Sequence, residues 1–371
     1  MKCKLSDICS FRKGKVEVEN LNAKNYISTE NMLPNKCGIT EASSLPTVPL
    51  TQEYKNGDVL VSNIRPYFKK IWQAQYDGGC SNDVLVFVPK PNTDKDFLYY
   101  VLADDDFFTY SMATSKGTKM PRGDKTLIMQ YEVPLIDLQV QEKIASVLKA
   151  LDKKIELNNE INNNLEQQAQ AIFKSWFIDF EPFSNRKPSK WSVSTLGNVS
   201  IMSAGGDKPQ NVSPIKTDLY EYPIYSNGLS NEGLYGFTDK PKISEESVTV
   251  SARGTIGFVC LRHIPYVPIV RLVTLIPKTE IVSAKYLYLW LKQLHITGTG
   301  TTQQQLTVPD FQKTEILVPS QKIVTLFTAT VEPIFEKIWA NQNENEKLSS
   351  LRDTLLPKLM SGELDVSDIE I

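Results

Sequence analysis

Two long segments of the chain place apolar residues alternately four and three positions apart, which is the spacing of a coiled-coil seam. In the middle of the chain the seam positions are Ile144, Leu148, Leu151, Ile155, Asn158, Asn162, Leu165, Ala169, Ile172 and Trp176. Towards the end they are Val324, Phe327, Val331, Ile334, Ile338, Asn341, Asn345, Leu348, Leu355 and Leu359. Since a helix cannot bury such a stripe alone, the pattern predicts two long helices that pack on each other.

The two segments repeat one another at a constant separation of 183 residues. The matched pairs are Ile155 and Ile338, Asn158 and Asn341, Asn162 and Asn345, Leu165 and Leu348, and Ile172 and Leu355. A polar residue in an apolar seam costs stability but penalises every wrong register, so we predict that the four asparagines set the helix register. With antiparallel packing about a local two-fold axis near residue 160, Asn158 faces Asn345 and Asn162 faces Asn341. Pro333 predicts a kink or a delayed start of the second helix.

Each helical segment follows a stretch of mixed strand and helix patterns in the same order. In the first stretch we expect two β-type runs at 58–64 and 83–88 and a helix from residue 97 onward. A polar loop at 115–122 and a strand that ends at Val133-Pro134 follow. The second stretch repeats this order, with β-type runs at 247–251 and 269–275 and a helix at 286–291. Its polar loop is expected at 298–305, and it closes on Val318-Pro319. We therefore predict an α/β (α+β) fold, a pseudo-two-fold repeat of two mixed modules joined by an antiparallel coiled coil. The expected parts are residues 1–140, 141–182, 183–319 and 320–371.

Composition is that of a globular protein with room for two domains, since 371 residues are 41% hydrophobic and 23% charged. No apolar run approaches the roughly 20 residues that a membrane span needs, and the N-terminus does not resemble a signal peptide. The five cysteines are odd in number without C-x-x-C spacing, so reduced thiols and a cytoplasmic location are expected. With two histidines, no metal site is expected.

The net charge of −2 argues at first against a nucleic-acid partner, because phosphate contacts need Lys and Arg. The charge is unevenly distributed, however. Residues 183–319 contain 14 basic and 10 acidic residues, whereas the helical residues 141–182 contain 5 and 7. Basic surface thus belongs to the modules and acidic surface to the helices, which is compatible with DNA binding but not diagnostic of it.

Three stretches resemble the specificity subunits of type I restriction–modification systems. They are Ala171–Phe183 at the end of the central helix, Pro188–Trp191 leading to Leu196-Gly197, and Leu355–Leu364 near the C-terminus. The resemblance covers the whole chain in the order recognition domain, helix, recognition domain, helix. It implies a subunit without catalytic activity in which each recognition domain reads half of a bipartite site in double-stranded DNA.

The resemblance also implies partners. The helices would fix the length of the unread spacer and dock two methyltransferase subunits, and the assembly would recruit restriction (translocase–nuclease) subunits. The alternatives are a non-catalytic coiled-coil scaffold that binds proteins, or an alternative specificity subunit that serves a shared methyltransferase.

Enzymatic motifs are missing from the sequence. We find no G-x-x-x-x-G-K-[ST] phosphate loop, no G-x-G-x-x-G after a strand, and no Asn/Asp-Pro-Pro-Tyr/Phe tetrapeptide of adenine methyltransferases. The sequence therefore predicts no catalytic residue and no cofactor.

Candidate DNA contacts are basic and amide side chains that follow strands or lie in the polar loops. In the first module they are Arg65, Lys69, Lys116, Lys119 and Arg122, and in the second Arg253, Gln303, Gln304 and Gln305. Arg can read guanine bidentately, Gln suits adenine, and Lys more often holds phosphates. The alternatives are surface ion pairs with Asp104–Asp106 or Asp124, and a solvated polar loop for the glutamines.

An aromatic cluster at the end of the central helix includes Trp176, Phe177 and Phe180. Acidic Asp179 and Glu181 lie among these rings, which favours packing over stacking on bases. We expect the three aromatics to serve in the core or in docking a partner.

Overall fold

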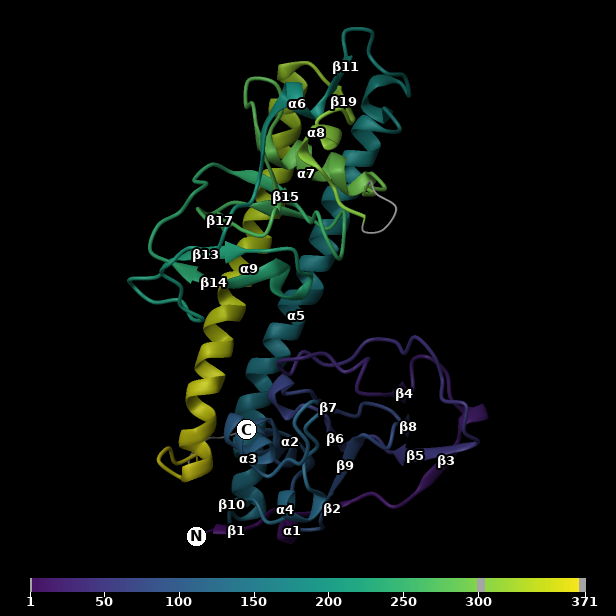
Figure 1. The fold of residues 1–371 in the computed structure, drawn as a ribbon, viewed down its shortest axis with the longest axis vertical. Helices are drawn as coiled ribbons and strands as arrows, with labels where there is room; N and C mark the ends of the chain where they lie inside the picture. Colours follow the sequence, from purple (N-terminus) through teal and green to yellow (C-terminus); the bar gives the residue numbers. More distant parts are fainter. Residues whose placement is uncertain (1, 299–303, 367–371) are drawn as a thin grey trace. The chain divides into compact units, whose positions relative to one another are not determined.

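The computed structural model describes residues 2–298 and 304–366 (Figure 1). The chain divides into two compact units. Unit 1 comprises Met1–Asn158 with Gln342–Ile371, and unit 2 comprises Asn159–Asn341. Each unit thus combines one globular module with about half of each long helix.

The module of unit 1 is built on two four-stranded sheets. The first has the order β2 (Cys9–Phe11), β9 (Val84–Pro89), β6 (Val59–Ser62) and β7 (Ile71–Gln73), all antiparallel. The second has the order β3 (Lys15–Glu17), β5 (Leu50–Tyr54), β8 (Gly78–Cys80) and β4 (Tyr26–Ile27), with β4 and β8 parallel. A further antiparallel pair joins β1 (Lys2–Lys4) to β10 (Glu132–Pro134). The helices are α1 (Leu5–Ile8), α2 (Lys95–Ala103), α3 (Asp105–Ala113) and α4 (Lys125–Ile128), with 3-10 turns η1 (Val18–Asn20) and η2 (Pro66–Phe68).

The module of unit 2 has the corresponding parts. Its four-stranded sheet has the order β12 (Ser200–Ala204), β18 (Val273–Pro277), β15 (Ser247–Val250) and β16 (Val259–Arg262). A three-stranded sheet has the order β14 (Leu234–Thr238), β13 (Tyr222–Tyr225) and β17 (Val267–Pro268), and β11 (Ser192–Thr195) pairs with β19 (Glu315–Val318). The helices are α6 (Leu196–Val199), α7 (Ala284–Gln293) and α8 (Val308–Phe311), with 3-10 turns η3 (Glu181–Phe183) and η4 (Ser230–Gly233).

The predicted repeat is confirmed by these elements. In both modules the first short strand pairs with the strand before the long helix, and a four-residue helix follows it. In both, the helix after the sheet starts at a polar N-cap, Asp94 for α2 and Ser283 for α7, whose side chain accepts backbone N–H bonds. The same local signals therefore produce the same topology twice.

One strand prediction is wrong in its extent. A strand was expected over 269–275, but β18 begins only at Val273. Val270 and Arg271 have φ of 51° and 62°, in the left-handed region that strands do not use. The apolar run Ile269–Leu275 therefore contains a turn before its strand.

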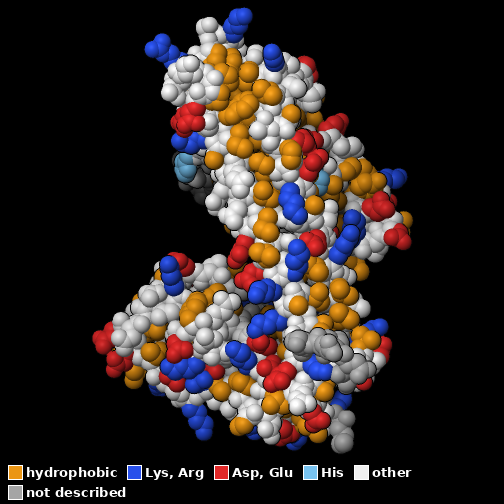
Figure 2. Space-filling model, turned by 180° about the vertical axis from the view of Figure 1, so that it is seen from behind, with side chains coloured by type: hydrophobic (Ala, Val, Ile, Leu, Met, Phe, Trp, Pro, Cys, Tyr) orange, Lys and Arg blue, Asp and Glu red, His pale blue; other side chains and the backbone are white. Residues whose placement is uncertain are grey.

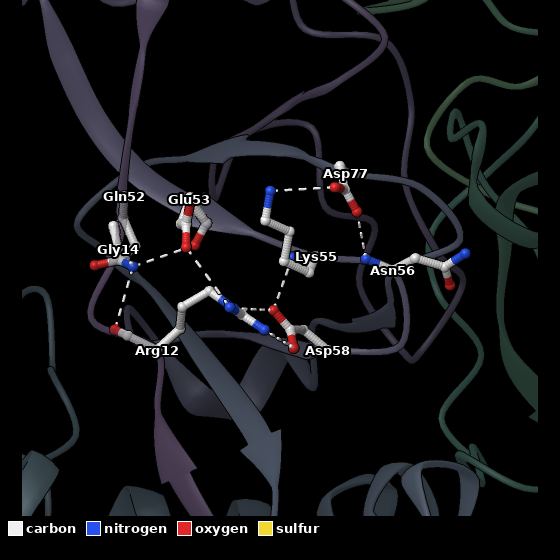
Figure 3. A network of polar contacts seen from close by, with 8 residues as sticks. All are labelled: Arg12, Gly14, Gln52, Glu53, Lys55, Asn56, Asp58 and Asp77. Carbon is white, nitrogen blue, oxygen red and sulfur yellow. Dashed lines mark hydrogen bonds and ion pairs between the residues drawn. The ribbon is translucent and has the colours of Figure 1, made fainter.

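A polar network fixes the start of β6 in unit 1 (Figure 3). Arg12, in the connection from β2 to β3, donates Nη2 to the buried Asp58 at 2.8 Å and also donates its Nε to that carboxylate. Asp58 accepts the backbone N–H of Lys55 at 2.8 Å, while Asp77 accepts that of Asn56 at 2.9 Å. The hydrogen bond to Asp58 raises the pKa of Arg12 above its usual value. Arg12 is therefore a structural cation and not a candidate for DNA contact.

The two long helices are α5 (Leu138–Phe177) and α9 (Gln321–Ser361) (Figure 1). Every predicted seam position on both helices is buried or half-buried. Within unit 1, Asp152 pairs with Arg352 at 2.7 Å and Lys154 with Glu344 at 3.4 Å. Residue numbers rise along one helix as they fall along the other, so the predicted antiparallel coiled coil is confirmed.

Of the two effects expected of Pro333, the delayed start is wrong, because α9 begins at Gln321 and runs through the proline. The kink stays a prediction. A proline removes one helical hydrogen bond, in this case at the carbonyl of Ala329. Val331 and Phe335, on either side of the proline, are 0% and 3% exposed. Packing of this face stabilises the helix more than the missing bond destabilises it.

The predicted asparagine pairs are confirmed. Asn158 donates its Nδ2 to Oδ1 of Asn345 at 2.9 Å, and Asn341 donates its Nδ2 to Oδ1 of Asn162 at 2.8 Å. The donors, Asn158 and Asn341, are each 1% exposed and are equivalent in the repeat. The contact is therefore the same in both units, and its role in setting the register stays a prediction.

Single and double replacements measure this coupling. Replacing Asn162 with leucine is expected to lower the free energy of unfolding by about 1–3 kcal/mol, because the buried Asn341 amide loses its acceptor. Adding Asn341→Leu is expected to restore most of that loss, since no buried amide then lacks a partner. Urea unfolding of the full chain measures both, with Asn163→Leu at an exposed position as control. Additive losses would contradict the pairing.

Candidate nucleic-acid interface

The structure brings two predicted basic groups of unit 1 together at the end of β6. Arg65 follows this strand by three residues, and its backbone N–H donates to Pro121 O at 2.8 Å. Ile64 and Arg122 form an antiparallel bridge. Arg65 thus lies beside the polar loop 115–122, although 50 residues separate them in the sequence.

The polar loop is a narrow hairpin that points its tip into solvent. Lys116 and Arg122 exchange backbone hydrogen bonds of 2.9 and 3.0 Å, and Gly117 has φ of 92°. Lys119, between the paired residues, is exposed. The hairpin therefore projects from the module beside Arg65, a shape that can enter a DNA groove.

The ion-pair alternative is found for Lys69 and Lys116, and Arg122 forms an ion pair with an aspartate that was not expected. Lys69 lies 2.7 Å from Asp105, Lys116 2.7 Å from Asp124, and Arg122 3.1 Å from Asp83. The hydrogen bond from Lys116 lowers the pKa of the Asp124 carboxyl. Exposed pairs of this kind are worth only about 0–1 kcal/mol, so a phosphate can displace the carboxylate, and DNA contact by these residues stays a prediction.

Arg65 differs from those residues, because a polar atom of its side chain is buried without a hydrogen-bond partner. Among the described residues, its Nε and the Oδ1 of Asn63 are buried and have no hydrogen-bond partner. Arg65 also has a left-handed backbone, φ 52° and ψ 65°. Buried polar atoms are rarely left unpaired, and strained residues gather at binding sites. Both features mark Arg65 as the principal candidate in unit 1.

Unit 2 has a candidate at the equivalent position. Arg253 follows the last residue of β15 by three residues, as Arg65 follows β6, and it donates Nη2 to Oε1 of Gln305 at 2.9 Å. Gln305 precedes the N-cap of α8 by two residues, as Arg122 precedes that of α4. The structure thus joins Arg253 and Gln305. Gln304 is exposed, and Gln303 lies outside the described residues.

Two residues near Arg253 did not stand out in the sequence. Asn227 accepts the backbone N–H of Ala252 at 2.7 Å and donates to Val270 O at 2.6 Å. Arg271 follows Val270 and is exposed. A charged residue within the apolar run Ile269–Leu275 was the only signal for Arg271, and no local pattern indicates Asn227.

The aromatic cluster lies in the core of unit 2. Phe177 is 1% exposed, and its ring centroid lies 4.9 Å from both Tyr286 and Phe327. Of the two roles expected for Phe177, the structure shows packing in the core, and a docking role stays a prediction. Trp176 and Phe180 are half-buried against the same core, so their docking role stays a prediction.

Charges of both signs alternate on the face shown in Figure 2, where Lys and Arg side chains lie next to Asp and Glu. Within residues 2–298 and 304–366, no cluster of three or more His, Cys, Asp or Glu side chains could hold a metal ion. No helix of that part of the chain is both long and apolar enough to cross a membrane.

Comparison with known proteins places these observations in a family. The family model described as "Type I restriction modification DNA specificity domain" matches residues 1–167 and again residues 188–349. The specificity subunit of type I restriction enzyme HindI from Haemophilus influenzae is 27% identical over 91% of this chain and 94% of its own length. The specificity subunit of type I restriction enzyme MjaIX from Methanocaldococcus jannaschii is 27% identical over 76% of this chain and 72% of its own length.

A solved structure supports the fold. The S subunit of a type I restriction–modification system from M. genitalium aligns with a TM-score of 0.57 at 18% identity, covering 99% of this chain and 96% of that one. The family model matches most of the chain, in two successive stretches that correspond to the two repeats. This chain therefore belongs to the family of type I restriction modification DNA specificity domains.

Proposed function

We propose that this chain is the DNA-recognition subunit of a type I restriction–modification complex and that each module reads one half of a bipartite site. The observation that supports this most is the repeated arginine. Arg65 and Arg253 follow equivalent strands by the same three residues, and each lies beside the loop that precedes a short helix. Two modules of different loop sequence thus each place an arginine at the same position after an equivalent strand.

The chemistry of the loops suits base reading. A guanidinium group can donate two hydrogen bonds to the O6 and N7 atoms of guanine, and a glutamine amide suits adenine. The lysines Lys69, Lys116 and Lys119 suit phosphates, which orient the module without specifying sequence. Because the two loops differ in residues, the two halves of the site are expected to differ in sequence.

The helices and the partners belong to the same proposal. Residues 1–140 and 183–319 act as recognition domains, and 141–182 and 320–371 as the helices that set the unread spacer. The helices also dock two methyltransferase subunits, and restriction subunits join the complex. The chain itself is non-catalytic, which agrees with the missing motifs of phosphate binding and methyl transfer.

An exchange of modules tests this function. Replacing residues 1–140 with the recognition domain of another specificity subunit is expected to change one half of the methylated site and leave the other half unchanged. Sequencing of methylated adenines in cells that express the chimera gives the result. A change in both halves would contradict independent modules.

A salt titration separates DNA reading from the scaffold alternative. The complex of this chain with methyltransferase subunits is expected to bind DNA much more weakly as the salt concentration rises, because each phosphate contact releases counterions. DNA affinity that does not respond to salt would favour a protein-binding scaffold.

A further inference from the structure

In the second module, the side chain of Asn227 joins the segment that contains the half-buried Arg253 to the segment that contains the exposed Arg271. The Oδ1 of Asn227 accepts the N–H of Ala252 at 2.7 Å, and its Nδ2 donates to the carbonyl of Val270 at 2.6 Å. Arg253 follows Ala252, and Arg271 follows Val270. Asn227 therefore holds the backbones next to both arginines at a fixed separation.

The backbone that presents Arg271 is constrained on its other side too. The N–H groups of Val270 and Arg271 donate to Gly206 O and Gly205 O, both at 2.9 Å. A Cβ at Gly205 would lie 2.9 Å from the N and O atoms of Ile269, so only glycine permits this approach. Val270 and Arg271 are consecutive non-glycine residues in the left-handed region. For a β-branched residue such as Val270 this is a rare, strained conformation, and such strain gathers at binding sites.

The two arginines have different environments within this arrangement. The guanidinium of Arg253 is held by Gln305 at 2.9 Å. Arg271 is exposed, and among the described residues its side chain has no ion pair or hydrogen bond. A rigid backbone with an unengaged guanidinium is arranged to bind an external acceptor.

We propose that Arg271 is a further specificity-determining residue, which contacts guanine in the DNA half-site read by the second module, and that Asn227 is its positioning residue. This rests on the proposed DNA-reading function. A phosphate contact needs only a nearby positive charge, which a flexible lysine supplies equally well. A bidentate contact with the O6 and N7 atoms of guanine needs the planar fork of a guanidinium. The Asn227 and Gly205 contacts fix the backbone from which Arg271 presents that group.

The test uses the full chain assembled with methyltransferase subunits and duplexes in which the second half-site is randomised. Arg271→Ala and Arg271→Lys are both expected to reduce the preference for guanine at one position by about 10-fold to 100-fold. Asn227→Ala is expected to weaken the preference at the same position and to add nothing in the Arg271→Ala background. Preferences in the first half-site serve as internal control, and Arg186→Ala, at an exposed arginine of the same unit, as control variant.

Three outcomes would overturn the proposal. Arg271→Lys could keep the full guanine preference, or Arg271→Ala could weaken binding equally for every sequence, and either result would assign Arg271 to a phosphate. An effect of Asn227→Ala that adds to that of Arg271→Ala would remove the positioning role. If the wild-type complex shows no sequence preference, the proposed function itself fails. Because Arg271 is exposed, its two variants decide the matter even if Asn227→Ala does not fold.

Discussion

Replacing Phe177 with alanine is expected to lower the free energy of unfolding by about 3–5 kcal/mol, the range for a buried aromatic ring. The ring is 1% exposed and packs on Trp191 at 5.7 Å as well as on Tyr286 and Phe327 at 4.9 Å. These three partners come from β11, α7 and α9 or the residues beside them, so the cavity would loosen the attachment of both long helices to the module. Chemical denaturation of the full chain measures the loss.

The neighbouring Ile178 provides the matched control. Its side chain is 42% exposed at the end of the same helix, so Ile178→Ala is expected to change stability by less than about 0.5 kcal/mol. Trp176→Ala, at a half-buried position, tests docking by measuring co-purification with the methyltransferase subunit. If Phe177→Ala left unfolding unchanged and abolished only that assembly, the ring would be a docking residue after all.

The helical part of the fold could be predicted from sequence because its information is local and periodic. The seam positions and the 183-residue repeat depend only on spacing within each segment, and they led to the pairs Asn158 with Asn345 and Asn162 with Asn341. Two matching asparagines per helix leave one antiparallel arrangement that pairs them all. The delayed helix start expected from Pro333 was wrong, because a proline signal is also local and takes no account of the packing of Val331 and Phe335 around it.

The site could be predicted only in part, because its residues meet through contacts between distant segments. Arg65, Arg253 and Gln305 were indicated one by one. The contacts of Arg65 with Pro121 and of Arg253 with Gln305 were not. Asn227 acts through two backbone groups, and no spacing rule encodes such a contact. Likewise, Lys69 pairs with Asp105, one of the aspartates expected for the ion-pair alternative, whereas the partner of Arg122, Asp83, was not expected. Residue type indicates possible chemistry, whereas the tertiary contacts decide which side chains remain available.

Replacing either Arg65 or Arg253 with alanine is expected to relax base preference in one half of the site only. A bidentate arginine contributes about 1–3 kcal/mol of discrimination, so the preferred base at one position would lose a factor of about 10 to 100 over its competitors. Arg65→Ala is expected to act on the half read by unit 1, and Arg253→Ala on the half read by unit 2. Methylation of duplex libraries by the assembled complex measures both preferences in one experiment.

A lysine of the polar loop 115–122, beside Arg65, distinguishes a base contact from a phosphate contact. Lys119 is exposed at the tip of the hairpin, so Lys119→Ala is expected to weaken binding to all sequences and to reduce the salt dependence by about one counterion. If Arg65→Ala behaved like Lys119→Ala, Arg65 would hold a phosphate and the unpaired Nε would have no part in specificity. If Arg65→Ala and Arg253→Ala altered the same half-site, the two modules would not read separate halves. If each substitution altered only its own half-site, the arginine that follows β6 and β15 by three residues would be a base contact in both modules.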